Sequence, residues 1–292
     1  YPQDVINCLK CHNPDDEATP DAGNWQEVPN MMSCGGCHDI FGPNAAGQHP
    51  NFQPADNSNC ANCHTPANIV EMHATPNATP NNPQLLPGQR DIAYELVEAT
   101  VDAVSSEVTV QFRITSDGTA LDVTNLPADL ATPGRFPGFL LAYALPQQGF
   151  DEPADYNNLG GTGGQPISVS IGDLDPINTT APVGTLAFNS ADGVLTAVLT
   201  DAAAQFPMGA TLRAVGLQGY FQQDINGTTV SLHTPSAVVA ITGDTERRGI
   251  VDSAKCAECH EWFEGHGGNR VLDMEICLLC HVPNLSSSGR TL

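Results

Sequence analysis

The chain has 292 residues, 40% of them hydrophobic, which is enough for one large domain or two to three small ones with a buried core. Its 33 acidic against 10 basic residues give a formal net charge of −23, which argues against nucleic acid or an anionic membrane surface as main partner. No run reaches the roughly 18 apolar residues of a membrane span, so none is expected. The first residue is Tyr1, and we expect either a removed export signal or a segment of a longer chain.

A repeated cysteine motif begins within residues 1–84. All ten cysteines of the chain fall into five Cys-x-x-Cys-His units. The units are CLKCH at 8–12, CGGCH at 34–38, CANCH at 60–64, CAECH at 256–260 and CLLCH at 277–281. This is the attachment sequence of c-type haem, in which two thiols bind the vinyl groups and the histidine binds the iron. Zinc knuckles need no histidine after every pair, and redox dithiols have no use for five copies.

We therefore predict five covalently bound haem c groups. The attachment cysteines are Cys8, Cys11, Cys34, Cys37, Cys60, Cys63, Cys256, Cys259, Cys277 and Cys280. The proximal iron ligands are His12, His38, His64, His260 and His281.

The four remaining histidines are candidates for the distal face of the haems: His49, His73, His233 and His266. His233 is the weakest, because it lies in a strand-like segment far from any motif. Five bis-histidine haems need ten histidines and the chain has nine, so one iron must be served differently. The alternatives are a histidine outside this sequence, an open site, or a methionine out of Met31, Met32, Met72, Met208 and Met274.

The haem motifs lie at both ends of the chain and predict three domains. Residues 1–84 form a trihaem segment with almost no periodic apolar pattern, so the porphyrins must supply its core. The stretch 77–90, which overlaps the end of this segment, is rich in Pro, Asn and Gly and is predicted to be a linker. The segment 251–292 is a dihaem segment, in which 253–264 is compatible with a helix that Gly265 would end. Because such a helix shortens the reach of His266, we expect this histidine to ligate the neighbouring haem of Cys277 and Cys280.

The region 85–250 contains no cysteine and alternates apolar with polar residues. Strands are predicted within 94–103, 107–118, 139–145, 167–174, 183–201 and 211–243. The turns SADG at 190–193 and DING at 224–227 favour hairpins. The fold class is therefore mixed: an antiparallel β-sandwich or split barrel at 85–250, flanked by loop-rich, haem-packed segments with short helices.

Four stretches resemble the outer-surface multihaem cytochromes of the OmcA/MtrC type, which alternate β-domains with pentahaem domains and pass electrons out of the cell. RRGIVDSAKCAECHEWFEGHGGNR and CLLCHVPN are similar to the opening of that family's pentahaem domain. NWQEVPNMMSCGGCHDIFG and GQHPNFQPADNSNCANCHTPANIVEMH are similar to its closing half. The resemblance implies that His49, His73 and His266 are distal ligands.

The order of these stretches departs from the family, because the closing half comes first and the opening half last. The family's Ile-His-x-x-His stretch is also absent. The chain is then either a piece that spans parts of two pentahaem domains, or a permuted unit whose ends meet those of neighbouring copies.

The leading functional hypothesis is an electron carrier, not an enzyme, because bis-histidine ligation leaves no iron site for a substrate. It would act extracellularly or at the cell surface, with the periplasm as second choice, since haem is attached outside the cytoplasm. Its partners would be other multihaem cytochromes, copies of itself in a filament, or extracellular acceptors such as a mineral or a soluble shuttle. The alternative is a reductase of a small oxyanion or nitrogen compound at one open iron, which the uniform motifs do not favour. A third hypothesis gives the β-domain an adhesive role.

Overall fold

The computed structural model describes residues 5–10, 12–15, 17–38, 56–78, 84–149, 151–257, 260 and 262–286. The chain divides into two compact units, Tyr1–Gly88 and Gln89–Leu292. Within the described ranges, no helix is long and apolar enough to cross a membrane.

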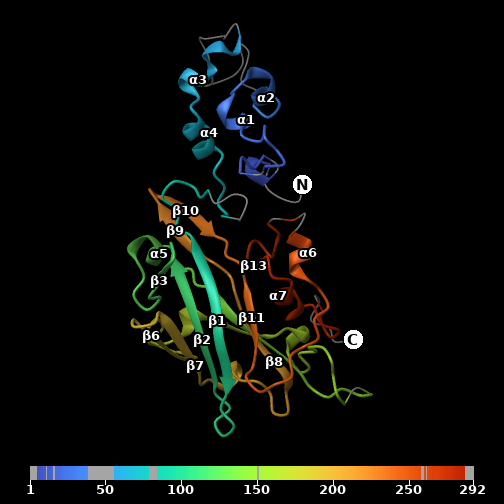
Figure 1. Cartoon of the computed structure of the whole chain (residues 1–292). Coiled ribbons are helices and arrows are strands. Elements are labelled where there is room, and N and C mark those ends of the chain that lie inside the picture. Colours follow the sequence, from blue (N-terminus) through green and yellow to red (C-terminus); the bar gives the residue numbers. More distant parts are fainter. Residues whose placement is uncertain are drawn as a thin grey trace. The chain divides into compact units, whose positions relative to one another are not determined.

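The first unit is built from short helical turns joined by loops (Figure 1). Its elements are η1 (Cys8–Lys10), α1 (Asn24–Glu27), α2 (Met31–Gly35), η2 (Asn57–Asn59), α3 (Cys60–Cys63) and α4 (Pro66–Met72). The side chain of Asn30 caps α2 by accepting from the Ser33 N–H, and Thr65 caps α4 by accepting from Asn68. Such caps stabilise helices that are too short to persist by propensity alone.

Few apolar side chains of the first unit are buried. Among its described residues, the buried hydrophobic side chains of the core are those of Ala22 and Ala74. Met32 and Met72 are 90% and 79% exposed. A protein segment without large buried side chains gains little from the hydrophobic effect. Side-chain burial therefore contributes little to the stability of the described part of this unit.

The second unit contains two antiparallel sheets. The first sheet has the order β1-β2-β7-β6, with β3 paired to β2, and the second has the order β11-β8-β4-β5. The bounds in the first are β1 (Ile92–Val101), β2 (Val108–Ser116), β3 (Thr119–Ala120), β6 (Gly184–Asn189) and β7 (Val194–Leu199). Those in the second are β4 (Gly138–Ala144), β5 (Ile167–Ser170), β8 (Thr211–Gln218) and β11 (Ala237–Ala240). The predicted antiparallel β-sandwich is confirmed.

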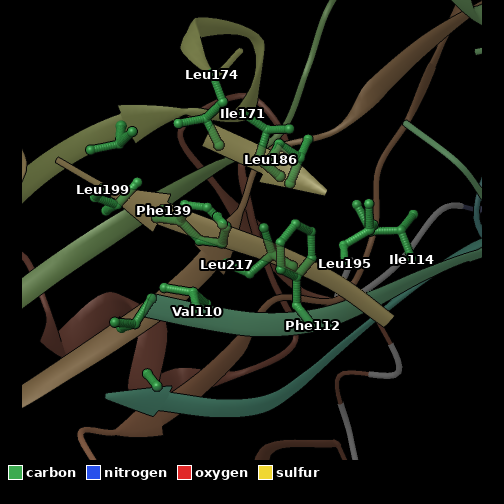
Figure 2. Close-up of a cluster of buried hydrophobic side chains, with 14 of the residues drawn as sticks. Val110, Phe112, Ile114, Phe139, Ile171, Leu174, Leu186, Leu195, Leu199 and Leu217 are labelled. Carbon is green, nitrogen blue, oxygen red and sulfur yellow. The ribbon is translucent and has the colours of Figure 1, made fainter. Parts of the chain in front are cut away.

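One hydrophobic core holds the sandwich together. Figure 2 shows side chains from both sheets in it, with Phe112 of β2 and Phe139 of β4 in edge-to-face contact at 5.2 Å between ring centroids. Along β2, buried and half-buried positions alternate over the whole strand. This is the period of two that the sequence pattern predicted. A helical turn, α5 (Ala128–Ala131), buries Leu130 against the same core.

Two further ribbons complete the second unit. The strands β9 (Phe221–Ile225) and β10 (Thr228–Leu232) form the hairpin predicted at DING, and β6 and β7 form the one at SADG. The ribbon β12 (Glu264–Gly265) with β13 (Arg270–Val271) lies between α6 (Ser253–Ala257) and α7 (Met274–Leu278).

The helix expected over 253–264 is shorter than predicted, because α6 spans Ser253–Ala257 and Glu264 belongs to a strand. Glu264 pairs with Val271 across the ribbon. Its carboxylate accepts a hydrogen bond from the Trp262 indole and contacts His233 of the β-domain. Contacts between distant segments therefore override the helical preference of this run.

The strand expected over 167–174 is shorter than predicted. It ends at Ser170, and a 3₁₀ turn, η4 (Ile171–Asp173), follows. The Ser170 hydroxyl caps that turn by accepting from the Gly172 N–H, while Ile171 stays buried in the core. Burial of apolar residues thus continues beyond the point where the β ladder stops.

Candidate haem-binding site

The five Cys-x-x-Cys-His units share one backbone hydrogen bond. In each, the histidine N–H donates to the carbonyl oxygen of the first cysteine, at 2.8 Å for His12 and His260 and at 2.9 Å for His38, His64 and His281. One turn of helix brings residues three apart to the same side. A turn of this kind suits the attachment of two thiols to one haem, with the histidine directly after them. All five of these histidines are exposed.

Three of the predicted site residues lie outside the described residues: Cys11, Cys259 and His49. Their roles stay predictions.

The histidines His38 and His73 come together in the first unit. Their ring centroids are 6.0 Å apart with an interplanar angle of 87°. His73 follows α4, and its Nδ1 donates to the carbonyl of Ile69 at 2.7 Å. This bond leaves the lone pair on Nε2, as in histidines that bind a metal. Trp25 of α1 packs edge-on against His73 at 5.8 Å.

A second pair of histidines comes together in the second unit. The ring centroids of His266 and His281 lie 6.2 Å apart at an interplanar angle of 45°. His281 follows α7 and belongs to CLLCH. His266 lies on the turn between β12 and β13, with a backbone φ of +55°.

Ring centroids about 6 Å apart would leave room for one metal ion between the two imidazoles of each pair, since a metal–nitrogen bond is about 2 Å long. The four residues therefore fit a bis-histidine haem at CGGCH and another at CLLCH. The ligand assignments themselves remain predictions.

The CLLCH motif is packed against the β-sandwich. Ile276 and Leu279 are fully buried against the face of β4 and β8 that points away from the main core. Gly216 of β8 permits this close approach, because a Cβ there would overlap the side-chain ends of both residues. Burial raises the pKa of both thiols of the motif, Cys277 and Cys280.

A buried asparagine ties the same motif to the β-domain. Asn158 is 0% exposed, and its Nδ2 donates to the carbonyl of Leu279 at 2.8 Å and to that of Gly164 at 3.1 Å. Its Oδ1 accepts from the N–H of Tyr143 at 3.1 Å. The motif's position is thus set by hydrogen bonds across more than a hundred residues of sequence. No local pattern in the sequence points to Asn158.

His233 lies directly after β10 and contacts the β12–β13 ribbon. Its Nδ1 is 2.8 Å from a carboxylate oxygen of Glu264, and its ring lies 4.8 Å from that of Tyr220. The side chain is 22% exposed. No pattern in the sequence indicates Glu264 as its partner.

The methionines considered as iron ligands differ in environment. Met208 lies in the β-domain before β8 and is 99% exposed, while Met274 begins α7 and is half-buried.

Five Cys-x-x-Cys-His motifs with the same backbone hydrogen bond, together with two pairs of imidazoles about 6 Å apart, are the features of a multihaem c-type cytochrome. No family model matches the chain. The multiheme cytochrome MtrC of Shewanella baltica (strain OS185) is 31% identical over 120 residues, which are 41% of this chain and 17% of that protein. Over these residues the chain is similar to a multihaem cytochrome, in agreement with the resemblance that its motifs indicated.

The fold matches that of a solved structure. The crystal structure of MtrC from Shewanella baltica OS185 aligns with a TM-score of 0.56 and 18% identity, over 98% of this chain and 48% of that one. The outer membrane decaheme cytochrome OmcA aligns over 69% of the chain at 16% identity, with a TM-score of 0.38 that is too low to indicate a common fold. The chain thus spans about half the length of the MtrC structure that it matches.

Proposed function

We propose that the chain is an electron carrier that holds five haem c groups and passes electrons between them at or outside the cell surface. The observation that carries the proposal is the common turn in all five Cys-x-x-Cys-His units, with the histidine N–H bonded to the first cysteine carbonyl. Haem supplies an iron that takes up and releases one electron. The protein supplies two thioether attachments and the axial imidazoles for each group.

The facing imidazoles support a specific set of distal ligands. His73 would complete the haem of CGGCH, opposite His38, and His266 would complete that of CLLCH, opposite His281. His49 would serve one of the other three haems. His233 is a candidate distal ligand only because the number of histidines is short, and its contacts favour another role. A methionine, a histidine from outside this sequence or an open iron would account for what remains.

The proposed functional division of the chain follows the motifs: a trihaem segment at 1–84, a β-domain at 85–250 and a dihaem segment at 251–292. The last segment packs against the sandwich through α7, so the β-domain acts as its support. A supporting role of this kind favours electron transfer over an independent adhesive function.

We place the protein outside the cytoplasm, extracellular or at the cell surface. The chemistry of haem attachment and the acidic, lysine-poor composition support this location. Its partners would be other multihaem cytochromes, copies of itself, or extracellular acceptors such as a mineral or a soluble shuttle. Assembly of copies into a filament is the finer form of this proposal.

The first test is the haem content and spin state of the purified protein. Intact mass should give five haems per chain, and EPR should show mainly low-spin ferric iron. The reduced protein should transfer electrons to ferric oxide or to a flavin in a stopped-flow experiment. A smaller number of haems would refute the cofactor assignment. A large high-spin component shifted by cyanide or nitrite would favour the reductase.

Electron microscopy tests the filament separately. Filaments with a repeat of one chain would support polymerisation, whereas discrete particles would refute it without affecting the electron-carrier proposal.

A further inference from the structure

We propose that His233 is a positioning residue, which holds the 265–269 corner so that His266 faces the iron of the CLLCH haem. The inference rests on the proposed function, in which His266 is the distal ligand of that haem. It assigns to His233 a role through Glu264 and Gly268 instead of through a bond to iron.

The corner that carries His266 cannot hold its shape by itself. His266, Gly267 and Gly268 have φ values of +55°, +66° and +78°, so three consecutive residues are left-handed. For a residue with a Cβ this conformation costs about 1–2 kcal/mol. The flanking strands β12 and β13 have two residues each, and such a ribbon is not stable alone. Neighbouring structure must therefore determine the conformation.

His233 contacts the corner on both sides of His266. On the preceding side, its Nδ1 is 2.8 Å from Oε2 of Glu264, an oxygen that also accepts from the Trp262 indole at 3.0 Å. On the following side, the backbone of Gly268 lies against the imidazole, because a Cβ at that position would overlap three atoms of the ring. The ring thus fills the space beneath the turn.

A second anchor from the β-domain holds the end of the same corner. Asn269 donates from Nδ2 to the carbonyl of His266 at 2.7 Å, and its Oδ1 accepts from Arg135 at 2.8 Å. The Gly219 N–H donates to the Asn269 carbonyl at 2.8 Å. The Arg135 guanidinium lies 4.1 Å from the ring centroid of Tyr220, which also contacts His233. The two anchors therefore share one aromatic residue.

The geometry separates the roles of the two histidines. The imidazole of His266 is exposed, and its ring centroid lies 6.2 Å from that of His281. The imidazole of His233 is mostly covered, with Nδ1 directed at a carboxylate. A carboxylate on Nδ1 orients a ring, and the ring here supports the turn. With His233 outside the ligand set, three distal histidines of this chain remain for five irons.

The test uses the holoprotein and the fraction of high-spin haem measured by EPR. His266→Ala sets the scale, because loss of one distal ligand should convert about a fifth of the total haem. His233→Ala and Glu264→Ala should each convert part of the same haem to high spin. The double variant should show no more high-spin haem than either single variant. His233→Asn, whose amide can replace Nδ1 as donor to Glu264, should restore the low-spin signal.

The control is Glu95→Ala, which breaks an exposed ion pair with Arg113 in the same domain and should leave the spectrum unchanged. Far-UV circular dichroism checks that every variant retains the sandwich. A His233→Asn protein as high-spin as His233→Ala, with Glu264→Ala unaffected, would make His233 a ligand and overturn the inference. So would a spectrum unchanged in both alanine variants while His266→Ala responds. No response to His266→Ala itself would refute the ligand assignment on which this inference depends, and would leave the electron-carrier proposal to its own test of haem content.

Discussion

Replacing Asn158 by alanine should destabilise the β-domain and loosen the CLLCH motif together. The side chain is fully buried and makes hydrogen bonds to the backbone of Tyr143, Gly164 and Leu279. Each bond contributes about 1 kcal/mol, and the backbone groups left buried and unpaired make the loss larger. The residue also has a φ of +44°, which asparagine tolerates better than alanine by about 1 kcal/mol. The expected loss is about 3–4 kcal/mol.

Asn226→Ala is the matched control for this change. Asn226 also has a left-handed backbone, with a φ of +53°, but it is exposed in the β9–β10 turn. It should lose only about 1 kcal/mol. Denaturant unfolding of the holoprotein, followed by far-UV circular dichroism, measures both variants. If the two free energies of unfolding agreed within about 0.5 kcal/mol, the buried hydrogen bonds of Asn158 would have no energetic role and the reasoning would be refuted.

Three further predictions concern other sites. His73→Ala should convert the CGGCH haem, about a fifth of the total, to high spin by EPR, and added imidazole should restore it; an unchanged spectrum would contradict the pairing with His38. Gly216→Val should cost about 2 kcal/mol in denaturant unfolding, because the new side chain meets α7; no loss would show that the helix packs loosely. Hydrogen bonding to Arg213 holds the pKa of Asp244 below its usual value. This bond therefore contributes stability above about pH 4 that is lost as the pH falls through the lower folded pKa, so Asp244→Asn should cost about 2 kcal/mol at pH 7 and less near pH 3. A difference independent of pH would contradict it.

The β-sandwich could be predicted because its strands carry their own signal. In β2, buried and half-buried residues alternate from Val108 to Ser116, because successive side chains of a strand point to opposite faces and one face is buried. The haem motifs could also be predicted, since the cysteines and the histidine of each motif lie within five consecutive residues. Both features depend on short stretches of sequence.

The remainder of the site depends on contacts between distant segments. Nothing near Asn158 indicates that it bonds to Leu279, 121 residues later. The run from Ser253 has a helical pattern. Glu264 nevertheless lies in a strand, where it pairs with Val271 and its carboxylate contacts His233. A single sequence without its three-dimensional neighbours does not contain these constraints.

The packing of α7 also has a consequence for the order of events during biogenesis. Cys277 and Cys280 are half-buried once Ile276 and Leu279 contact the sheet, and burial raises the pKa of both thiols. A covered thiol of raised pKa is less reactive than one on an open chain. We therefore expect haem attachment at CLLCH to precede docking of this segment, so that cofactor attachment comes before completion of the second unit.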